Sequence, residues 1–220
     1  MPVLEATELY RFFHTGDDEV AALRGVTIMV DAGEFTALRG PSGSGKSTLL
    51  ACLAGIDEPD GGMVSVLGER MTRRPEPERA RLRARHLGML MQSGNLFEHL
   101  TVRANIRLQM QISGCDRPSE IDGLLGSLGL HGLADVLPVH LSGGEAARAG
   151  VAVALAAKPS ILLCDEPTAE VEAATEQRVI DCFIEICRSG AAVLIVTHSN
   201  ALAARADRIL HIRDGRIVHA

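Results

Sequence analysis

The 220-residue sequence lacks the features that mark several other classes of protein. It has no C-x-x-C pair among its five cysteines, and its longest apolar run, residues 149–157, is far shorter than the roughly 18 residues that span a bilayer. The formal net charge of −6 argues against a general nucleic-acid-binding protein, which normally carries a basic excess. The N-terminus shows no basic segment followed by an apolar one, so no secretory signal is expected. We therefore expect a soluble protein whose thiols are reduced and mostly buried.

Residues 40–48 read Gly-Pro-Ser-Gly-Ser-Gly-Lys-Ser-Thr and fit the spacing G-x-x-x-x-G-K-[ST] at every fixed position. A predicted strand over residues 35–39 precedes them and a predicted helix over residues 48–54 follows, which is the setting of a phosphate-binding loop. Backbone N–H groups and the helix N-terminus attract phosphate there, while Lys46 would reach the β and γ phosphates and Ser47 would bind Mg²⁺. The predicted nucleotide-binding residues of this loop are Gly40, Pro41, Ser42, Gly43, Ser44, Gly45, Lys46, Ser47 and Thr48.

Two adjacent carboxylates follow a second apolar segment. Residues 160–164 are expected to form a buried strand, and Asp165 ends it. A phosphate-loop enzyme needs a second carboxylate to orient the metal, and the end of a buried strand adjacent to the loop is the expected place for it. Glu166 comes next and could take the proton of an attacking water. The alternative, a plain polar turn before Pro167, would be favoured only without the phosphate loop.

The remaining pattern predicts an α/β fold: a P-loop NTPase core with a mixed sheet and helices, an inserted helical subdomain and an N-terminal antiparallel β part. We expect a single domain over residues 1–220, in which residues 1–91 and 158–220 form the core and about 92–157 the helical subdomain. Successive strand, helix and strand after residue 160 imply parallel pairing. The other expected strands are residues 3–10, 26–30, 61–68, 87–91 and 191–197, with a tail hairpin over 208–218; the other expected helices are 145–157 and 175–187, and glycine-separated helical segments lie in 100–137.

Five features in order resemble the motif set of ABC-type ATPases, and the match covers nearly the whole chain. They are residues 40–48, Gln92, Leu-Ser-Gly-Gly-Glu at residues 141–145, residues 161–166 and His198. The Leu-Ser-Gly-Gly-Glu segment is the family's signature and separates it from other phosphate-loop proteins. The local physics agrees, because this segment precedes a predicted helix and so forms a second helix N-terminus suited to phosphate oxygens.

The resemblance implies a head-to-tail homodimer, in which ATP on the phosphate loop of one subunit is covered by the signature of the other. An aromatic is expected to stack on adenine; Phe13 lies at the matching distance from the loop, with Tyr10 and Phe12 as rivals. The implied cofactors are ATP and Mg²⁺. The implied site residues are Glu166, His198 and Gln92 for catalysis, Ser47, Gln92 and Asp165 for the metal, and Phe13, Ser142, Gly143, Gly144 and Glu145 for the nucleotide besides the loop.

Residues 13–16, 78–83 and 95–102 look most like the lipoprotein-release, macrolide-efflux and cell-division branch of this family. That resemblance implies a cytoplasmic ATPase subunit, peripheral on the inner face of the cell membrane, which energises a separate integral membrane permease and binds no nucleic acid. We expect the helical subdomain, with the loop over residues 92–100, to meet this partner through Phe97, although Phe97 could instead pack into its own subdomain.

Two other functions stay open at this point. One is an ATP-binding module that switches a membrane partner with little hydrolysis, because Glu172 stands where the family has aspartate and Ala146-Ala147 replace the usual Gln-Gln. The other is a soluble ABC-type factor that acts on nucleic acid. Such factors usually carry paired ATPase domains or a long coiled-coil insertion, and this sequence shows neither.

Overall fold

The computed structural model describes residues 1–16, 18–169 and 171–218. The chain order of the central strands is β3 (Phe35–Arg39), β6 (Leu87–Leu90), β7 (Ile161–Asp165), β8 (Ala192–Val196), β9 (Arg208–Arg213) and β10 (Arg216–Val218). They form one sheet in the order β10-β9-β3-β8-β7-β6, in which β10 is antiparallel to β9 and the other neighbours are parallel. The parallel pairing predicted around residues 161 and 192 is confirmed, and so is the tail hairpin, which turns at Asp214 and Gly215 with φ values of 47° and 74°.

The strand that ends in Asp165 contacts the helix that follows the phosphate loop, but in the sheet it is not the direct neighbour of the strand that precedes the loop. β8 lies between β7 and β3. Asp165 nevertheless lies on the face of the sheet that α1 covers, because successive strand residues point to opposite faces. Ile161 and Leu163 pack in the same cluster as helix α1 (Lys46–Leu53), and Asp165 continues their phase. The carboxylate thus belongs to the α1 face of the sheet.

The N-terminal part is an antiparallel sheet, as predicted, but its first two strands are longer than expected. Its strands are β1 (Pro2–Thr15), β2 (Asp18–Asp31), β4 (Gly61–Val66) and β5 (Glu69–Arg70), in the order β2-β1-β4-β5. The pairing of β1 with β2 shifts register between Ala6 and Leu9 and again between Arg11 and Phe12. Each shift breaks the alternation of apolar and polar residues, so the pattern beyond residue 10 does not read as strand.

The helices are α1, α2 (Glu76–His86), α3 (Val102–Ile112), α4 (Ile121–Ser127), α5 (Gly143–Leu155), α6 (Ala173–Arg188) and α7 (Asn200–Ala203), with short 3₁₀ turns at Pro118–Glu120 and Pro138–His140. Helix α1 begins two residues earlier than predicted, because Gly45 forms its N-cap in the left-handed region. Helix α5 also begins two residues earlier than residue 145, since Ser142 caps it, and α7 was not predicted. None of these described helices combines the length and the apolar character needed to cross a bilayer.

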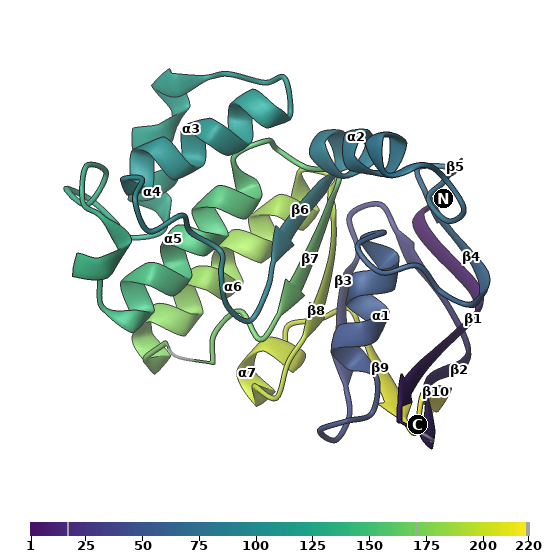
Figure 1. The fold of residues 1–220 in the computed structure, drawn as a ribbon. Coiled ribbons are helices and arrows are strands. Elements are labelled where there is room, and N and C mark those ends of the chain that lie inside the picture. Colours follow the sequence, from purple (N-terminus) through teal and green to yellow (C-terminus); the bar gives the residue numbers. More distant parts are fainter. Residues whose placement is uncertain (17, 170, 219–220) are drawn as a thin grey trace.

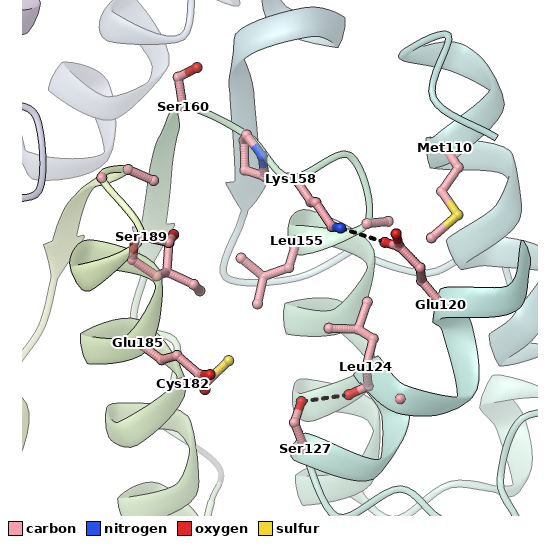
Figure 2. A pocket seen from close by; sticks show the side chains of 16 residues that line it. Met110, Glu120, Leu124, Ser127, Leu155, Lys158, Ser160, Cys182, Glu185 and Ser189 are labelled. Atoms are coloured by element: carbon pink, nitrogen blue, oxygen red, sulfur yellow. Dashed lines mark hydrogen bonds and ion pairs between the residues drawn. The ribbon is translucent and has the colours of Figure 1, made fainter. Parts of the chain in front are cut away.

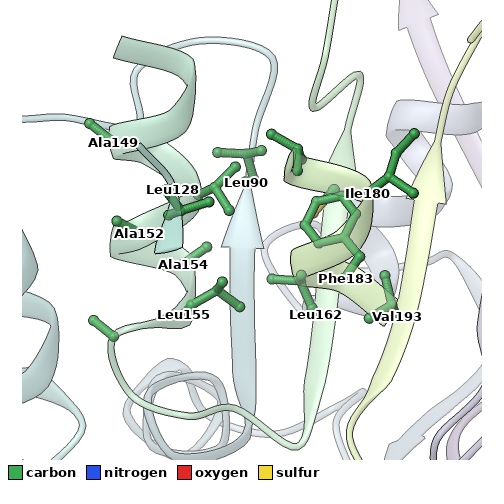
Figure 3. Close-up of a cluster of buried hydrophobic side chains, with 14 of the residues drawn as sticks. Leu90, Leu128, Ala149, Ala152, Ala154, Leu155, Leu162, Ile180, Phe183 and Val193 are labelled. Atoms are coloured by element: carbon green, nitrogen blue, oxygen red, sulfur yellow. The ribbon is translucent and has the colours of Figure 1, made fainter. Parts of the chain in front are cut away.

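The layers follow from the alternation of apolar residues along the central strands. Leu162 and Val193 pack in one cluster with residues of helices α3 to α6, whereas their neighbours in sequence pack in a second cluster with α1 and the antiparallel sheet. Figure 1 shows these two sets of elements on opposite sides of the central sheet. Figure 3 shows Leu162 and Val193 beside Phe183 of α6, whose ring meets that of Phe35 edge-on with centroids 6.2 Å apart. Helices α3, α4 and α5 join the same cluster. We therefore propose that the helical subdomain of about residues 92–157 shares one core with the sheet.

Three of the five cysteines are buried, as expected. Burial raises the pKa of the Cys52 thiol to about 12, and Cys164 and Cys187 are likewise inside. Cys182 is half-buried and Cys115 is exposed, the latter against expectation because it falls in the loop after α3. The buried thiols therefore behave as small apolar side chains of the core.

Candidate active site

The phosphate loop connects β3 to α1, and two of its glycines allow close packing against the rest of the chain. Gly45 has φ of 101°, and a side chain there would collide with the backbone carbonyl of Ala22 in β2. A side chain at Gly40 would collide with the carbonyl of Ile212 in β9. Because neither position has room for a Cβ atom, the loop packs closely against β2 of the antiparallel sheet and β9 of the central sheet, while Gly43 stays exposed.

The phosphate loop contains two buried polar groups, the Lys46 ammonium and the Ser44 hydroxyl. Lys46 is only 8% exposed, and its ammonium donates hydrogen bonds to the carbonyl oxygens of Gly40 at 2.9 Å and Pro41 at 2.8 Å. The Ser44 hydroxyl is buried without a hydrogen-bond partner among the described residues. A buried hydroxyl normally has a partner, so an unpartnered hydroxyl in a loop that also carries a buried ammonium fits a loop built around a polyanion.

Glu166 and His198 meet where β7 and β8 end. The backbone N–H of His198 donates to Glu166 Oε2 at 3.1 Å, and His198 Nε2 lies 3.6 Å from Glu166 Oε1. Glu166 has φ of 50°, an uncommon backbone conformation for a non-glycine residue, and its own N–H donates to the Val196 carbonyl at 3.0 Å. Its Oε1 atom is buried and accepts no hydrogen bond within the described chain. One carboxylate oxygen is thus anchored and the other can accept a proton.

The signature segment forms the capped start of α5. Glu145 N–H donates to the Ser142 hydroxyl at 3.3 Å, and Ser142 N–H donates to Glu145 Oε2 at 2.8 Å, which is a complete capping box. These bonds hold the pKa of the Glu145 carboxyl below its usual value. Ser142 and Gly143 are exposed, with Gly144 half-buried behind them. Glu145 therefore orders a turn whose outer surface could meet a ligand brought by another molecule.

Gln92 lies in the exposed loop after β6, and a neighbouring amide braces that loop. Asn95 Oδ1 accepts from the backbone N–H of Met91 at 2.8 Å, and Asn95 Nδ2 donates to the Met91 carbonyl at 2.6 Å. A cavity of about 330 Å³ is lined by Gln92, Glu166 and Gly143 together with residues of the same loops. The structure thus brings three predicted site segments, from distant parts of the sequence, around one hollow.

Phe13 lies near the end of β1, where it pairs with Val20 of β2. Its ring is 40% exposed, and the Arg11 guanidinium lies over it at 4.7 Å from the centroid. Val20 is two residues before Ala22, the residue that contacts the phosphate loop at Gly45. Tyr10, by contrast, packs against Gly61 and donates to Glu8 at 3.3 Å. Arg11 therefore lies over one face of the Phe13 ring, and the opposite face is the one that could stack on a base, whereas the Tyr10 ring is held by Gly61 and Glu8.

Two residues that position these segments, Asn105 and Arg39, were not predicted from the sequence. Asn105 is 3% exposed; it accepts from Phe97 N–H at 2.7 Å and donates to the carbonyls of Leu100 and Thr101, each at 3.0 Å. Its place on the apolar face of α3 was a usable signal, because a buried amide needs partners. Arg39 Nη2 donates to the His198 carbonyl at 3.4 Å across 159 residues, and no local signal predicts that contact.

A larger cavity of about 930 Å³ lies elsewhere, between α4, α6 and the end of α5 (Figure 2). Lys158 and Glu120 form an ion pair of 2.8 Å at its edge, and Leu124, Leu155 and Cys182 supply apolar lining. None of the site residues predicted from the sequence lines this cavity. The predicted site residues therefore lie away from the larger cavity, and the size of a cavity does not identify the candidate active site.

The residues proposed for Mg²⁺ fit a hard cation. Ser47 is exposed in the first turn of α1, and Asp165 faces the same side of the sheet as α1. Among the described residues no group of three or more His, Cys, Asp or Glu could hold a metal by itself. A hydroxyl, a carboxylate and the Gln92 amide offer only oxygen donors, which suits an ion that also takes phosphate oxygens and water.

The family described as "ABC transporter" matches residues 23–169. The chain belongs to the ABC transporter family. The protein named uncharacterized ABC transporter ATP-binding protein YbbA of Escherichia coli K12 is 38% identical over 98% of this chain and 96% of its own length. The lipoprotein-releasing system ATP-binding protein LolD of Novosphingobium aromaticivorans is 38% identical over 97% of both chains.

Macrolide export ATP-binding/permease protein MacB of Chlorobium phaeobacteroides is 37% identical over 99% of this chain, which spans about one third of that protein's length. The structure titled as the dimeric ABC transporter cassette MJ0796 superimposes with a TM-score of 0.94 at 28% identity, covering 98% of this chain and 97% of that one. The predicted fold class and the resemblance to ABC-type ATPases are thereby confirmed.

Glu172, which stands where the ABC family has aspartate, occupies the N-cap of α6 and makes no side-chain capping bond with the residues described. Aspartate at an N-cap reaches the backbone N–H groups of the first turn, whereas the extra methylene of glutamate carries the carboxylate past them. We expect Glu172→Asp to raise the free energy of unfolding by about 0.5–1 kcal/mol in denaturant melts. Glu172→Ala is the control and should change it by only a few tenths; equal effects of the two substitutions would contradict the capping argument.

Proposed function

We propose that the chain is the ATP-binding and ATP-hydrolysing subunit of an ABC transporter complex, and that it energises a separate membrane permease through head-to-tail dimerisation. The observation that carries the proposal is the Glu166 carboxylate, with Oε2 bonded to the His198 N–H and Oε1 buried without a hydrogen bond from any residue that the structure describes. That arrangement favours hydrolysis over a module that only switches a partner. The net charge of −6 argues against the nucleic-acid alternative.

ATP binding is proposed to use the phosphate loop of one subunit and the signature of a second. Lys46 would exchange its bonds with the loop carbonyls for the β and γ phosphates, and the Ser44 hydroxyl would gain a partner. Phe13 would stack on adenine from the adjoining sheet. Ser142 and Gly143 are exposed at a capped helix N-terminus, so they are available to the nucleotide of another copy. The dimeric neighbour MJ0796 supports a two-subunit site.

Hydrolysis is proposed to join a water oxygen to the γ-phosphorus and to break the bond to the β,γ-bridging oxygen, giving ADP and phosphate. Glu166 Oε1 takes the proton that the water loses. His198 contacts the γ-phosphate, and Gln92 orients the water from across the shared hollow. Mg²⁺, held by Ser47, Asp165 and Gln92, would neutralise charge on the phosphates. The neighbouring cassette described with ADP and Pi bound supports this product pair.

Nucleotide binding is tested by Lys46→Ala. Removal of a buried ammonium from the phosphates should weaken ATP affinity about ten- to hundredfold, since a charge-assisted hydrogen bond contributes about 1.5–3 kcal/mol. A fluorescent ATP analogue titrated into the purified protein measures the change. Lys158→Ala is the matched control, because that lysine is exposed and pairs with Glu120 outside the loop. Equal affinity of both variants would remove Lys46 from the binding site.

The membrane partner is proposed to dock on the loop over residues 92–100, which places the subunit in the cytoplasm at the inner face of the membrane. Phe97 is 55% exposed, and its ring meets that of His99 edge-on with centroids 6.0 Å apart. Asn105 fixes the backbone of Phe97 through bonds to both its N–H and its carbonyl. A rigid loop that presents an exposed aromatic is suited to anchor an interface. A displacement of this loop by the docked partner would be transmitted to Gln92 through residues 93–96.

Phe97→Ala should lower the ATPase activity of the complex purified with its permease by about tenfold, because a buried aromatic anchor is typically worth more than 1–2 kcal/mol at an interface. Basal hydrolysis and melting temperature of the isolated subunit should hardly change, since the ring is exposed. Met29→Ala, at an equally exposed site on β2, serves as control. Loss of stability in Phe97→Ala, or full stimulation by the permease, would place the docking surface elsewhere.

A further inference from the structure

A carboxylate that the sequence interpretation did not single out joins the two segments that carry Glu166 and His198. Glu176 lies in the first turn of α6, and its Oε1 accepts hydrogen bonds from the Thr168 hydroxyl at 3.0 Å and from the Ser199 hydroxyl at 2.6 Å. Thr168 belongs to the turn after β7, where it is 8% exposed, and Ser199 follows β8. One oxygen atom thus bridges the ends of two neighbouring parallel strands.

Further hydrogen bonds of Ser199 hold its hydroxyl in this bridge. Its oxygen accepts the Leu202 N–H at 3.1 Å, which caps α7, and its backbone N–H donates to Thr197 Oγ1 at 2.9 Å. A hydroxyl has a single proton to donate, and here that proton goes to Glu176. On the other side of the segment, Arg39 holds the His198 carbonyl. The residue proposed to contact the γ-phosphate is therefore clamped from β3 and from α6.

At the other end of the bridge, Thr168 is linked to Glu166. The N–H of Ala169 donates to the Glu166 carbonyl at 3.2 Å, so Thr168 sits inside the turn that gives Glu166 its unusual backbone conformation. A carboxylate oxygen accepts without donating, and hydrogen bonds to an ionised acceptor are roughly twice as strong as neutral ones. Glu176 can therefore hold both hydroxyls at once.

We propose that Glu176 is a positioning residue for ATP hydrolysis, which sets the placement of His198 relative to Glu166 by tying Ser199 to Thr168. The inference rests on the proposed function. The competing explanation is a purely structural one, in which an acidic residue in the first turn of α6 stabilises the helix through its dipole. The structural explanation requires the negative charge of the Glu176 carboxylate. The positioning role requires only a hydrogen-bond acceptor oxygen at the position of Glu176 Oε1.

Steady-state ATP hydrolysis by Glu176→Ala, Glu176→Gln and the neighbouring control Gln177→Ala separates the two roles. We expect Glu176→Ala to lower kcat about tenfold and to leave KM within about twofold, since misplaced catalytic groups slow the chemistry while the phosphate loop is untouched. Glu176→Gln keeps an acceptor oxygen and should retain kcat within about threefold. Gln177, which bonds Asp181 at 2.7 Å on the exposed side of α6, should tolerate alanine.

A second set of variants tests the bridge itself. Ser199→Ala should lower kcat by a similar factor, and Glu176→Ala combined with Ser199→Ala should lower it no further, because both changes remove the same bond. Thr168→Ala and Ser199→Ala also carry the test if Glu176→Ala proves too unstable to purify. Wild-type kcat in these variants, equal losses in Glu176→Ala and Glu176→Gln, or additive losses in the double variant would each overturn the inference. A wild-type protein that hydrolyses no ATP would contradict the proposed function instead.

Discussion

Glu166→Gln is expected to abolish most ATP turnover while ATP binding is kept. General-base catalysis contributes about 10²–10⁴-fold, and the amide that replaces the Oε1 carboxylate oxygen cannot accept the proton of the attacking water. The hydrogen bond from the His198 N–H to Oε2 can persist with the amide oxygen, so the local structure should survive. Phosphate release should therefore fall at least about a hundredfold. Because ATP is bound and not consumed, the ATP-bound dimer should accumulate and be visible by size-exclusion chromatography.

The matched control is Glu185→Gln, which removes an exposed carboxylate from α6 without touching the site. It should hydrolyse ATP at the wild-type rate and show no trapped dimer. Turnover of Glu166→Gln at the level of this control would remove Glu166 from the mechanism. A loss of turnover accompanied by an equal loss of ATP binding would point to a folding defect and would also contradict the assignment.

Ser142→Arg is expected to separate nucleotide binding from dimerisation. Ser142 is exposed at the start of α5 and lies outside the phosphate loop of its own chain, so ATP affinity of the monomer should stay within about twofold. A bulky cation at the proposed contact surface should prevent two copies from closing on ATP, and turnover should fall more than about tenfold. The lost cap should cost about 1 kcal/mol of stability, which is too little to unfold the protein.

Light scattering with and without ATP measures the dimer, and a fluorescent ATP analogue measures the affinity. Ser127→Arg introduces the same bulk and charge at an exposed serine that ends α4, so it controls for surface charge. It should dimerise normally. If Ser142→Arg dimerised and turned over as this control does, the signature would not cover the nucleotide of a second copy.

The phosphate loop could be predicted because its chemistry constrains every fixed position. A glycine is needed wherever the backbone approaches Ala22 or Ile212, and one ammonium is needed at Lys46. The central strands were equally visible, since runs such as residues 192–196 are apolar on both faces and have few other interpretations. Fold class and the main site motifs therefore follow from local sequence.

Contacts between distant segments were not predictable in the same way. The bulges in β1 hide the second half of that strand, and the interposition of β8 between β3 and β7 depends on how the whole sheet is ordered. Arg39 meets His198 across 159 residues, and Glu176 meets Ser199 across 23. Arginines and glutamates in such places look like ordinary surface residues until the strands bring their partners together.

The measurement that tests the shared ATP site most directly is the turnover of an equimolar mixture of Lys46→Ala and Ser142→Arg subunits. Each variant alone should be nearly inactive, the first for lack of the buried ammonium and the second for lack of an intact signature surface. A mixed dimer would contain one site made of the intact Lys46 from one subunit and the intact Ser142 from the other. We predict that the mixture hydrolyses ATP clearly faster than the sum of the two separate preparations. Activity equal to that sum at all protein concentrations would contradict the head-to-tail arrangement.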